Sequence, residues 1–451
     1  MLTILHTADW HLGHSLHGVS REYEHLCFLN WLVVQLQECN ADALIIAGDI
    51  FDSANPSANA QSIFYDFLLQ AKEKNPSLDI VIIGGNHDSA ARLDAPSQIL
   101  QSLGIKVIGG LTRIDETELD NVPDIHQVQW QRLIVPLTDQ TGTVKAICGA
   151  MPFIRNADLP EIPNSTEAND PLISGVAELY RQLYEHMQHY KAEQDLDNSV
   201  AQILTGHCYM VGTELSELSE RRILGGNQHA LPATIFNADI NYVALGHLHK
   251  SQRVKNSDNI NIYYSGSPLP LSFSEKNYQH KIYKIMLEAN ARSDKISTQG
   301  SEPQLITTDI EAIIIPRAVA MRVIPERGYV SLSELEALIE EQDFELLNTR
   351  EQEEHKYPLL EVRLQLDKPE PGLRQQVETL LAEKAVRLLK ITTHYPGKGD
   401  ALAEQQPHTR LEELHPEDVF QQCYERNFEQ SAPKHILTLF RQLLESVEEN
   451  D

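Results

Sequence analysis

The chain has 451 residues, of which 41% are hydrophobic and 23% are charged, proportions typical of a globular protein with about two or three domains. Its formal net charge of −28 is unlike that of a free-standing nucleic-acid binder, which normally carries a basic face. No stretch approaches the roughly 20 apolar residues of a membrane-spanning helix, and five scattered cysteines without a Cys-x-x-Cys pair indicate a reducing cytoplasm.

Strands and helices alternate in the first part of the chain. Apolar runs predict strands at 2–9, 42–49, 78–88 and 105–110. Helical patterns between them cover 20–39, 57–73 and 94–103. This alternation favours an α/β core with a largely parallel sheet. Residues 125–153 read as strands with little helix between them, so we expect the sheet arrangement to become mixed there.

A polar, proline-containing loop at 156–171 comes next. A helix is expected near 173–192, followed by a strand at 199–207 and another that begins at Tyr242. Two further runs, 261–275 and 281–288, close the first region, which we assign to residues 1–290.

The composition and the spacing of the predicted elements change after a polar stretch at 290–302. Strand, helix, strand, helix and strand patterns follow at 317–326, 331–342, 358–366, 371–384 and 386–395. They predict a small second α/β domain over 303–397. Residues 398–410 read as a linker, and 411–451 contain two amphipathic helical patterns.

Five predicted strands of the first region are followed by residues of the types that bind metals, namely Asp, Asn and His. In open α/β sheets the site lies outside the carboxyl ends of the strands, so these residues can meet there. Each signal is weak alone, because a strand-end histidine is more often structural and Asp49 could simply cap a turn. Their joint presence predicts a two-metal site. The residues are Asp9 and His11, Asp49 and Asp52, Asn86 with His87 and Asp88, His207, and His247 with His249.

The stretch "YVALGHLHK" (242–250) carries the last two histidines. Residues i and i+2 of a strand share one face. If the extended conformation persists past Gly246, His247 and His249 therefore converge as a pair of metal ligands. The alternative is two surface histidines in a loop.

The donor types indicate which ions would suit the site. Carboxylate, imidazole and amide oxygen without thiolate favour a borderline-hard divalent ion, Mn²⁺ foremost, with Fe, Zn or Mg as substitutes. Paired ions about 3.5–4 Å apart act on phosphate esters by clamping the attacking and leaving oxygens. On a strongly acidic chain, such ions would also supply the positive charge that a substrate phosphate requires.

The order of motifs, D-x-H, G-D-x-x-D, G-N-H-D, G-H and G-H-x-H, resembles the calcineurin-like metallophosphoesterase superfamily. Over about the first 290 residues, "AGDIFD", "GGNHDS", "MPFIR", "LTGHCYMVG", "ALGHLH" and "YSGSPLPLSFSE" are similar to the nuclease-subunit family of bacterial SbcCD complexes. The resemblance implies a metallophosphoesterase β-sandwich flanked by helices, with a small α/β capping domain and C-terminal helices.

The resemblance also implies roles for individual residues. One ion would be held by Asp9, His11, Asp49 and His249, and the other by Asp49, Asn86, His207 and His247, with Asp49 bridging. His87 would orient the scissile phosphate and protonate the leaving oxygen, Asp88 would fix the His87 ring, and Asp52 would assist DNA positioning. Four histidines match no ligand position and are expected to be structural or on the surface. They are His14, His17, His25 and His229.

The implied activity is that of a Mn²⁺-dependent phosphodiesterase: an ATP-dependent exonuclease on duplex DNA ends and an endonuclease on single strands and hairpins, in recombination, replication and repair. Because the chain has no G-x-x-x-x-G-K-[ST], ATP dependence would come from the SMC-like ATPase SbcC, docked on helices 411–451. A homodimer within a heterotetramer is expected, in the cytoplasm at the nucleoid. The alternatives are a phosphatase or nucleotide phosphodiesterase of the same superfamily, and a metal-free scaffold.

Overall fold

A computed structural model describes residues 1–113, 128–160, 170–213, 230–255, 260–289, 306–345 and 353–396, together with the isolated Leu437. The predicted linker and, Leu437 apart, the predicted helices at 411–451 lie outside the described residues. So do the polar stretch 290–302 and residues 161–169 of the loop expected at 156–171.

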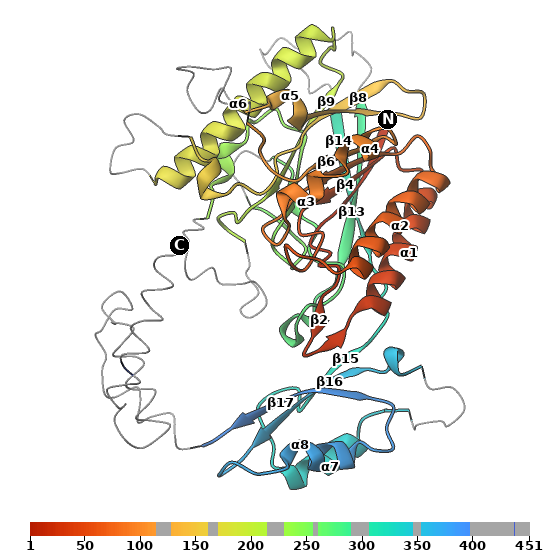
Figure 1. Cartoon of the computed structure of the whole chain (residues 1–451), viewed down its shortest axis with the longest axis vertical. Helices are drawn as coiled ribbons and strands as arrows, with labels where there is room; N and C mark the ends of the chain where they lie inside the picture. The colour runs from red at the N-terminus through yellow and green to blue at the C-terminus, as the bar shows by residue number, and fades with distance from the viewer. Residues whose placement is uncertain are drawn as a thin grey trace, which may run out of the picture.

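The first of two large sheets is built from the predicted strand–helix alternation. Its order is β14-β13-β1-β4-β5-β6 (Figure 1). Pairing is parallel from β1 to β6, whereas β13 runs antiparallel to both β1 and β14. The strands are β1 (Leu2–Thr7), β4 (Ala43–Ala47), β5 (Asp79–Ile83), β6 (Ile105–Ile108), β13 (Lys281–Ala289) and β14 (Ile306–Ile314).

The second sheet has the order β11-β12-β10-β9-β8-β7 and is mixed, as expected for this part of the chain. Its central pairs are parallel, and the outermost pair at each edge is antiparallel. The strands are β7 (Ile134–Thr138), β8 (Val144–Gly149), β9 (Ala201–His207), β10 (Tyr242–Gly246), β11 (Gln252–Arg253) and β12 (Ile262–Tyr264).

The two sheets pack face to face because successive strand residues point to opposite sides. In β4, Ile45 and Ala47 join the core that also contains Leu204 and Val243 of the second sheet. Leu44 and Ile46 point the other way, into a core shared with α1 (Glu22–Glu38) and α2 (Ala58–Lys74). These helices cover the outer face of the first sheet, and α6 (Pro171–Glu193) packs on the second. The predicted β-sandwich flanked by helices is confirmed.

One predicted helix is wrong in detail. The helix expected near 94–103 is only five residues long, α4 (Ser97–Gln101), and a separate short helix, α3 (Ala90–Asp94), precedes it. They are separated at Pro96, which lacks the backbone N–H that a continuous helix needs. The other short elements are α5 (Trp130–Leu133), the hairpin β2 (Ser15–Leu16) and β3 (Val19–Ser20), and the 3₁₀ helices η3 (Asn156–Asp158), η4 (Ala233–Ile235), η5 (Phe273–Glu275) and η6 (Glu354–Lys356). Among the helices that the structure describes, none could cross a membrane.

The small domain is a three-stranded parallel sheet, β15 (Met321–Ile324), β16 (Leu359–Gln365) and β17 (Arg387–His394). Helices α7 (Leu332–Glu340) and α8 (Leu373–Leu380) pack on it around a separate apolar core. Helix α7 starts with a capping box in which Ser331 and Glu334 satisfy each other's backbone N–H groups.

The predicted start of the small domain at 303 differs from the structure. Strand β14 pairs with β13 along its whole length, from Ile306 opposite Ala289 to Ile314 opposite Lys281. It is therefore the edge strand of the first sheet, and the chain leaves that sheet only after Ile314. The polarity of the 290–302 stretch marks a connection between two strands of one sheet rather than a domain boundary.

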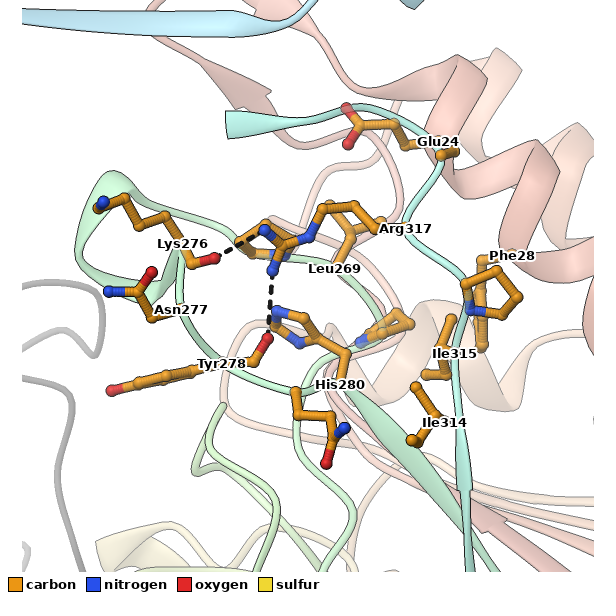
Figure 2. A pocket seen from close by; sticks show the side chains of 15 residues that line it. Glu24, Phe28, Leu269, Lys276, Asn277, Tyr278, His280, Ile314, Ile315 and Arg317 are labelled. Atoms are coloured by element: carbon orange, nitrogen blue, oxygen red, sulfur yellow. Dashed lines mark hydrogen bonds between the residues drawn. The ribbon is translucent and has the colours of Figure 1, made fainter. Parts of the chain in front are cut away.

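The two domains meet along the β2–β3 hairpin (Figure 1). Apolar side chains from both sides form one cluster there: Leu16 and Phe273 of the large domain with Val319, Met321, Val323, Leu359 and Leu389. Beside the junction, a cavity of about 430 Å³ lies between α1, residues 268–280 and the chain leaving β14 (Figure 2). There the Arg317 guanidinium donates to the main-chain carbonyls of Lys276 (2.6 Å) and Tyr278 (3.1 Å), which fixes the connection against the loop.

Candidate metal centre

The predicted site residues gather where the carboxyl ends of β1, β4, β5, β9 and β10 meet. Among the contacts that join the two sheets at this edge are two that involve main-chain groups. The His207 Nδ1–H donates to the Ala47 carbonyl (2.9 Å), and the backbone N–H of His247 donates to Asp9 Oδ1 (2.8 Å). Residues that are more than 150 positions apart in the sequence therefore share one small volume.

Asp49 lies at the centre of this volume. Its Oδ2 is 3.2 Å from His207 Nε2 and 3.7 Å from His11 Nε2, and its Oδ1 accepts the backbone N–H of His87 (2.8 Å). Two groups of side chains could each hold an ion, and Asp49 belongs to both. One group is Asp9, Asp49 and His207, and the other is His11, Asp49 and His87. A carboxylate shared in this way is suited to bridging two cations.

Asn86 adds an amide oxygen to one side of the centre. Its Oδ1 is 3.0 Å from His207 Nε2 and 3.1 Å from His247 Nδ1. The amide oxygen and the two imidazoles thus converge, with Asp49 beside them. These are the four residues expected around the second ion.

His249 lies on the other side, where its ring centroid is 5.2 Å from that of His11. The histidines of "YVALGHLHK" therefore face different partners, but not by the extended geometry that we expected. Strand β10 ends at Gly246, and His247 has a φ of 101°. The turn, rather than strand alternation, directs the two rings.

Backbone strain is concentrated in this centre. Asp9, His11 and Asp49 adopt positive φ angles of 53°, 48° and 49°. Such conformations are costly for residues with a side chain and persist where the surrounding structure imposes them, commonly at functional sites. Close packing adds to the constraint, since a Cβ at Gly85 would lie 2.2 Å from Asp49 Oδ1 and one at Gly246 would lie 1.9 Å from the Ala47 oxygen.

Burial and charge shift the pKa values of these groups. Burial raises the pKa of Asp9 to about 6, against the lowering effect of the His207 and His249 rings. Burial also opposes ionisation of Asp49, yet the neighbouring rings, His207 foremost, hold the pKa of its carboxyl well below its usual range. His207 is the counterpart: burial alone would lower its pKa, but the Asp49 and Asp9 carboxylates raise it to about 9.

The residues fit a pair of divalent cations. Asp9 Oδ2 and both ring nitrogens of His11 are buried without a hydrogen-bond partner among the described residues. Unpaired buried polar atoms are costly, so a ligand for them is expected. Burial lowers the pKa of His11 to about 4 and that of His247 to about 3, which keeps both imidazoles neutral and able to bind a metal.

His87 is half-buried at the rim, with its ring centroid 4.8 Å from that of His11. Its Nδ1–H donates to the main-chain carbonyl of Asp52 (2.8 Å). Nε2 is therefore the ring nitrogen that could contact a substrate. The Asp52 carboxylate itself lies 3.1 Å from His14 Nδ1 and 3.4 Å from His11 Nδ1. His14, expected to be structural or on the surface, therefore belongs to the perimeter of the centre.

The expected role of Asp88 is wrong. Its carboxylate does not fix the His87 ring. It accepts the backbone N–H groups of Ile50 (3.1 Å), Phe51 (3.0 Å) and Gly85 (2.9 Å). Asp88 is therefore a clamp that joins the loops after β4 and β5. Sequence adjacency to His87 suggested the wrong partner, because neighbouring side chains in a tight loop point in different directions.

Sequence reasoning missed Glu275. This fully buried carboxylate lies 2.9 Å from His249 Nδ1. Its only sequence signal is its place at the end of "YSGSPLPLSFSE", where no strand terminus marks it. Of the other histidines expected to be structural, His25 is buried against the Trp10 carbonyl (2.8 Å), and His229 lies outside the described residues.

Metal binding should release a proton from His207. Because Asp49 and Asp9 raise its pKa to about 9, the ring is protonated at pH 7.5 in the metal-free protein. Coordination requires its Nε2 lone pair, so Mn²⁺ affinity should rise about tenfold per pH unit from pH 7 towards pH 9 and then level off. Calorimetry in two buffers with different ionisation enthalpies should report about one proton released per protein at pH 7.5. Identical heats in both buffers would contradict this protonation state.

Comparisons with known proteins agree with this geometry. A family model described as calcineurin-like phosphoesterase matches residues 2–251, and one described as the type 5 capsule protein repressor C-terminal domain matches residues 317–428. The chain is 34% identical to the SbcD subunit of the SbcCD nuclease from Rhodobacter capsulatus, covering 88% of each chain. It is 28% identical to the SbcD of Escherichia coli K12 (93% and 92% covered) and 36% identical to that of Bacillus subtilis 168 (62% and 65% covered). A crystal structure of a dimetal phosphatase from Danio rerio aligns at 10% identity with a TM-score of 0.35, over 70% of this chain and 99% of that one, which is too distant to add to the assignment.

Proposed function

Because the chain belongs to the calcineurin-like phosphoesterase family, and within it to the SbcD nucleases, we propose that it cleaves DNA as the nuclease subunit of an SbcCD complex. The observation that carries the proposal is the position of Asp49 within two groups of metal-binding side chains. The activities proposed are exonuclease action on duplex ends, dependent on ATP bound by the partner, and endonuclease action on single strands and hairpins. The proposed setting is DNA recombination, replication and repair, in the cytoplasm at the nucleoid.

The proposed ligand sets share Asp49. Asp9, His11, Asp49 and His249 would hold one ion, and Asp49, Asn86, His207 and His247 the other. The second set is supported by distances of 3.0–3.2 Å that join Asn86 to His247 and join Asn86 and Asp49 to His207. We propose Mn²⁺ as the resident ion, with Fe, Zn or Mg as substitutes, because carboxylate, imidazole and amide oxygen suit borderline-hard cations. Bound as a pair, the ions would supply Lewis-acid charge and a nucleophile at neutral pH.

The protein's own groups would orient the phosphodiester and manage protons. His87, held through Nδ1–H by the Asp52 carbonyl, would place Nε2 toward the scissile phosphate and donate a proton to the leaving oxygen. Asp88 would keep the loops after β4 and β5 in register, which fixes Asp49 relative to His87. Asp52, whose pKa the neighbouring His11 and His14 hold well below its usual range despite partial burial, would remain charged and help to position DNA.

A substrate panel tests the proposal. Purified full-length protein with Mn²⁺ is incubated with linear duplex DNA, single-stranded DNA, a nitrophenyl phosphodiester and a phosphoprotein. Cleavage of both DNA forms and of the diester is expected. Turnover of the phosphoprotein without DNA cleavage would favour a phosphatase, and absence of both turnover and bound metal would favour a scaffold.

The partner is proposed to be SbcC, bound through residues 411–451, with two copies of each chain in the complex. A strongly acidic nuclease needs a partner to hold DNA, and the sequence has no phosphate-binding loop of its own for ATP.

Deleting residues 411–451 should abolish co-purification with SbcC. Mn²⁺-dependent cleavage of single-stranded DNA should stay within about twofold of the intact chain, because the proposed metal ligands all lie upstream, between Asp9 and His249. Affinity pull-down with tagged SbcC and a single-strand nuclease assay measure the two effects. Unchanged co-purification would reject the docking assignment.

A further inference from the structure

A buried carboxylate contacts one of the proposed metal ligands. Glu275 and His249 are 0% and 6% exposed, and Glu275 Oε1 lies 2.9 Å from His249 Nδ1. Since a carboxylate accepts hydrogen bonds, the contact is a bond donated by Nδ1–H. It therefore selects the tautomer of His249 whose Nε2 carries the lone pair.

The second oxygen of Glu275 is held equally firmly. Oε2 accepts the backbone N–H of Leu271 at 2.8 Å. The Glu275 main chain is fixed in turn, because its N–H donates to Ser272 (3.1 Å) and its carbonyl accepts from Tyr278 (2.8 Å). The same loop also contacts His249 directly, because the Ser267 N–H donates a hydrogen bond of 3.1 Å to the His249 carbonyl. Glu275 is thus a rigid support for the imidazole.

Other buried carboxylates of the large domain have different partners. Asp88 accepts the backbone N–H groups of Ile50, Phe51 and Gly85 and holds two loops together. Glu275 contacts both the backbone N–H of Leu271 and the ring of His249, a proposed ligand that lies 5.2 Å from His11. A carboxylate behind a metal-binding imidazole fixes the ring orientation and raises its basicity, and its loss weakens metal affinity by about 10–100-fold.

We propose that Glu275 is a positioning residue of the metal centre, which holds His249 in the Nδ1–H tautomer with Nε2 directed to one ion of the pair. This inference rests on the proposed function, because it assumes that His249 is a ligand. Glu275 lies outside the strand-end motifs, so the proposal implies that the 267–275 loop also influences metal affinity.

The test compares E275A and E275Q with E361Q in the full-length protein. Glutamine offers one acceptor oxygen, so E275Q must turn an amide NH₂ toward either Leu271 N–H or His249 Nδ1–H. Glu361 is a matched control, since it is also buried (2% exposed) but bonds Thr392 and Arg363 in the small domain. Mn²⁺ calorimetry, nitrogen NMR of the histidine rings and DNA cleavage at rising Mn²⁺ are the readouts.

We expect one of two Mn²⁺ sites to weaken about 10–100-fold in both Glu275 variants, with the other site and E361Q near wild type. Cleavage should recover at saturating Mn²⁺, and the His249 tautomer signal should change. Wild-type affinity at both sites, or lost cleavage that excess Mn²⁺ does not restore in a folded variant, would overturn the proposal. If E275A fails to fold, E275Q alone decides.

The wild-type protein distinguishes failure of this proposal from failure of the proposed function. Wild-type protein that binds Mn²⁺ but cleaves no DNA would reject the nuclease function and leave the affinity comparison intact. Wild-type protein that binds no Mn²⁺ would overturn both.

Discussion

Replacing Asp49 with asparagine should remove both bound ions and nearly all DNA cleavage. Asparagine keeps an oxygen for the backbone N–H of His87 but loses the charge that faces His207 and His11. Because this carboxylate is common to both groups of side chains that could hold an ion, its loss should affect the two ions together. Loss of a group that only hydrogen-bonds a metal ligand lowers metal affinity or activity by about 10–100-fold. We therefore expect loss of a shared ligand to lower cleavage by at least about 10³-fold.

Metal analysis and a duplex-end nuclease assay measure this result. Bound Mn²⁺ should fall from about two per chain to less than one if Asp49 bridges the pair. D66N serves as the matched control, because Asp66 lies on the outer side of α2 and bonds only Ser62 among the described residues. A D49N protein that keeps two Mn²⁺ and cleaves DNA within tenfold of wild type would refute the bridging assignment.

Replacing His87 with alanine should separate catalysis from metal binding. A positioned acid that protonates a leaving group contributes about 10²–10⁴-fold, so DNA cleavage should fall by that factor. The Mn²⁺ content should stay at the wild-type value, because His87 belongs to neither proposed ligand set. The geometry makes this a sharp test, since His87 also lies within reach of an ion held by His11 and Asp49.

A second substrate distinguishes the acid role from simple misfolding. Nitrophenolate leaves without protonation, so H87A should lose much less activity on a nitrophenyl phosphodiester than on DNA. H189A on the exposed surface of α6 is the control and should behave as wild type. Loss of one Mn²⁺ in H87A would identify His87 as a ligand, and equal losses on both substrates would reject the acid role.

Most of the elements, and the residues that gather at the strand ends, were predictable from the sequence. Apolar runs such as 42–49 and 199–207 are typical of buried strands, and the polar residues that follow them then lie at the strand ends. The donor types of these side chains predict a divalent metal ion. The β-sandwich was also predictable, because the motifs resemble those of a family with that arrangement of strands.

Partners and directions were decided by the tertiary structure. Sequence adjacency predicts that Asp88 contacts His87, but the loops after β4 and β5 place its carboxylate on backbone N–H groups instead. Glu275 was overlooked because its contact with His249 depends on a loop that no strand pattern marks. The polarity of the stretch at 290–302 predicts a domain boundary, whereas β14 returns to pair with β13 in the same sheet.

The difference has a physical cause. Local sequence governs the hydrophobic period and the chemistry of each side chain, and both are properties of a few adjacent residues. The direction of a side chain after a strand end depends on a backbone turn such as the positive φ of His247 or Asp49, which only the packing of distant segments imposes. The sequence therefore determined which groups this centre contains, and the assembled sheets decided which of them face one another.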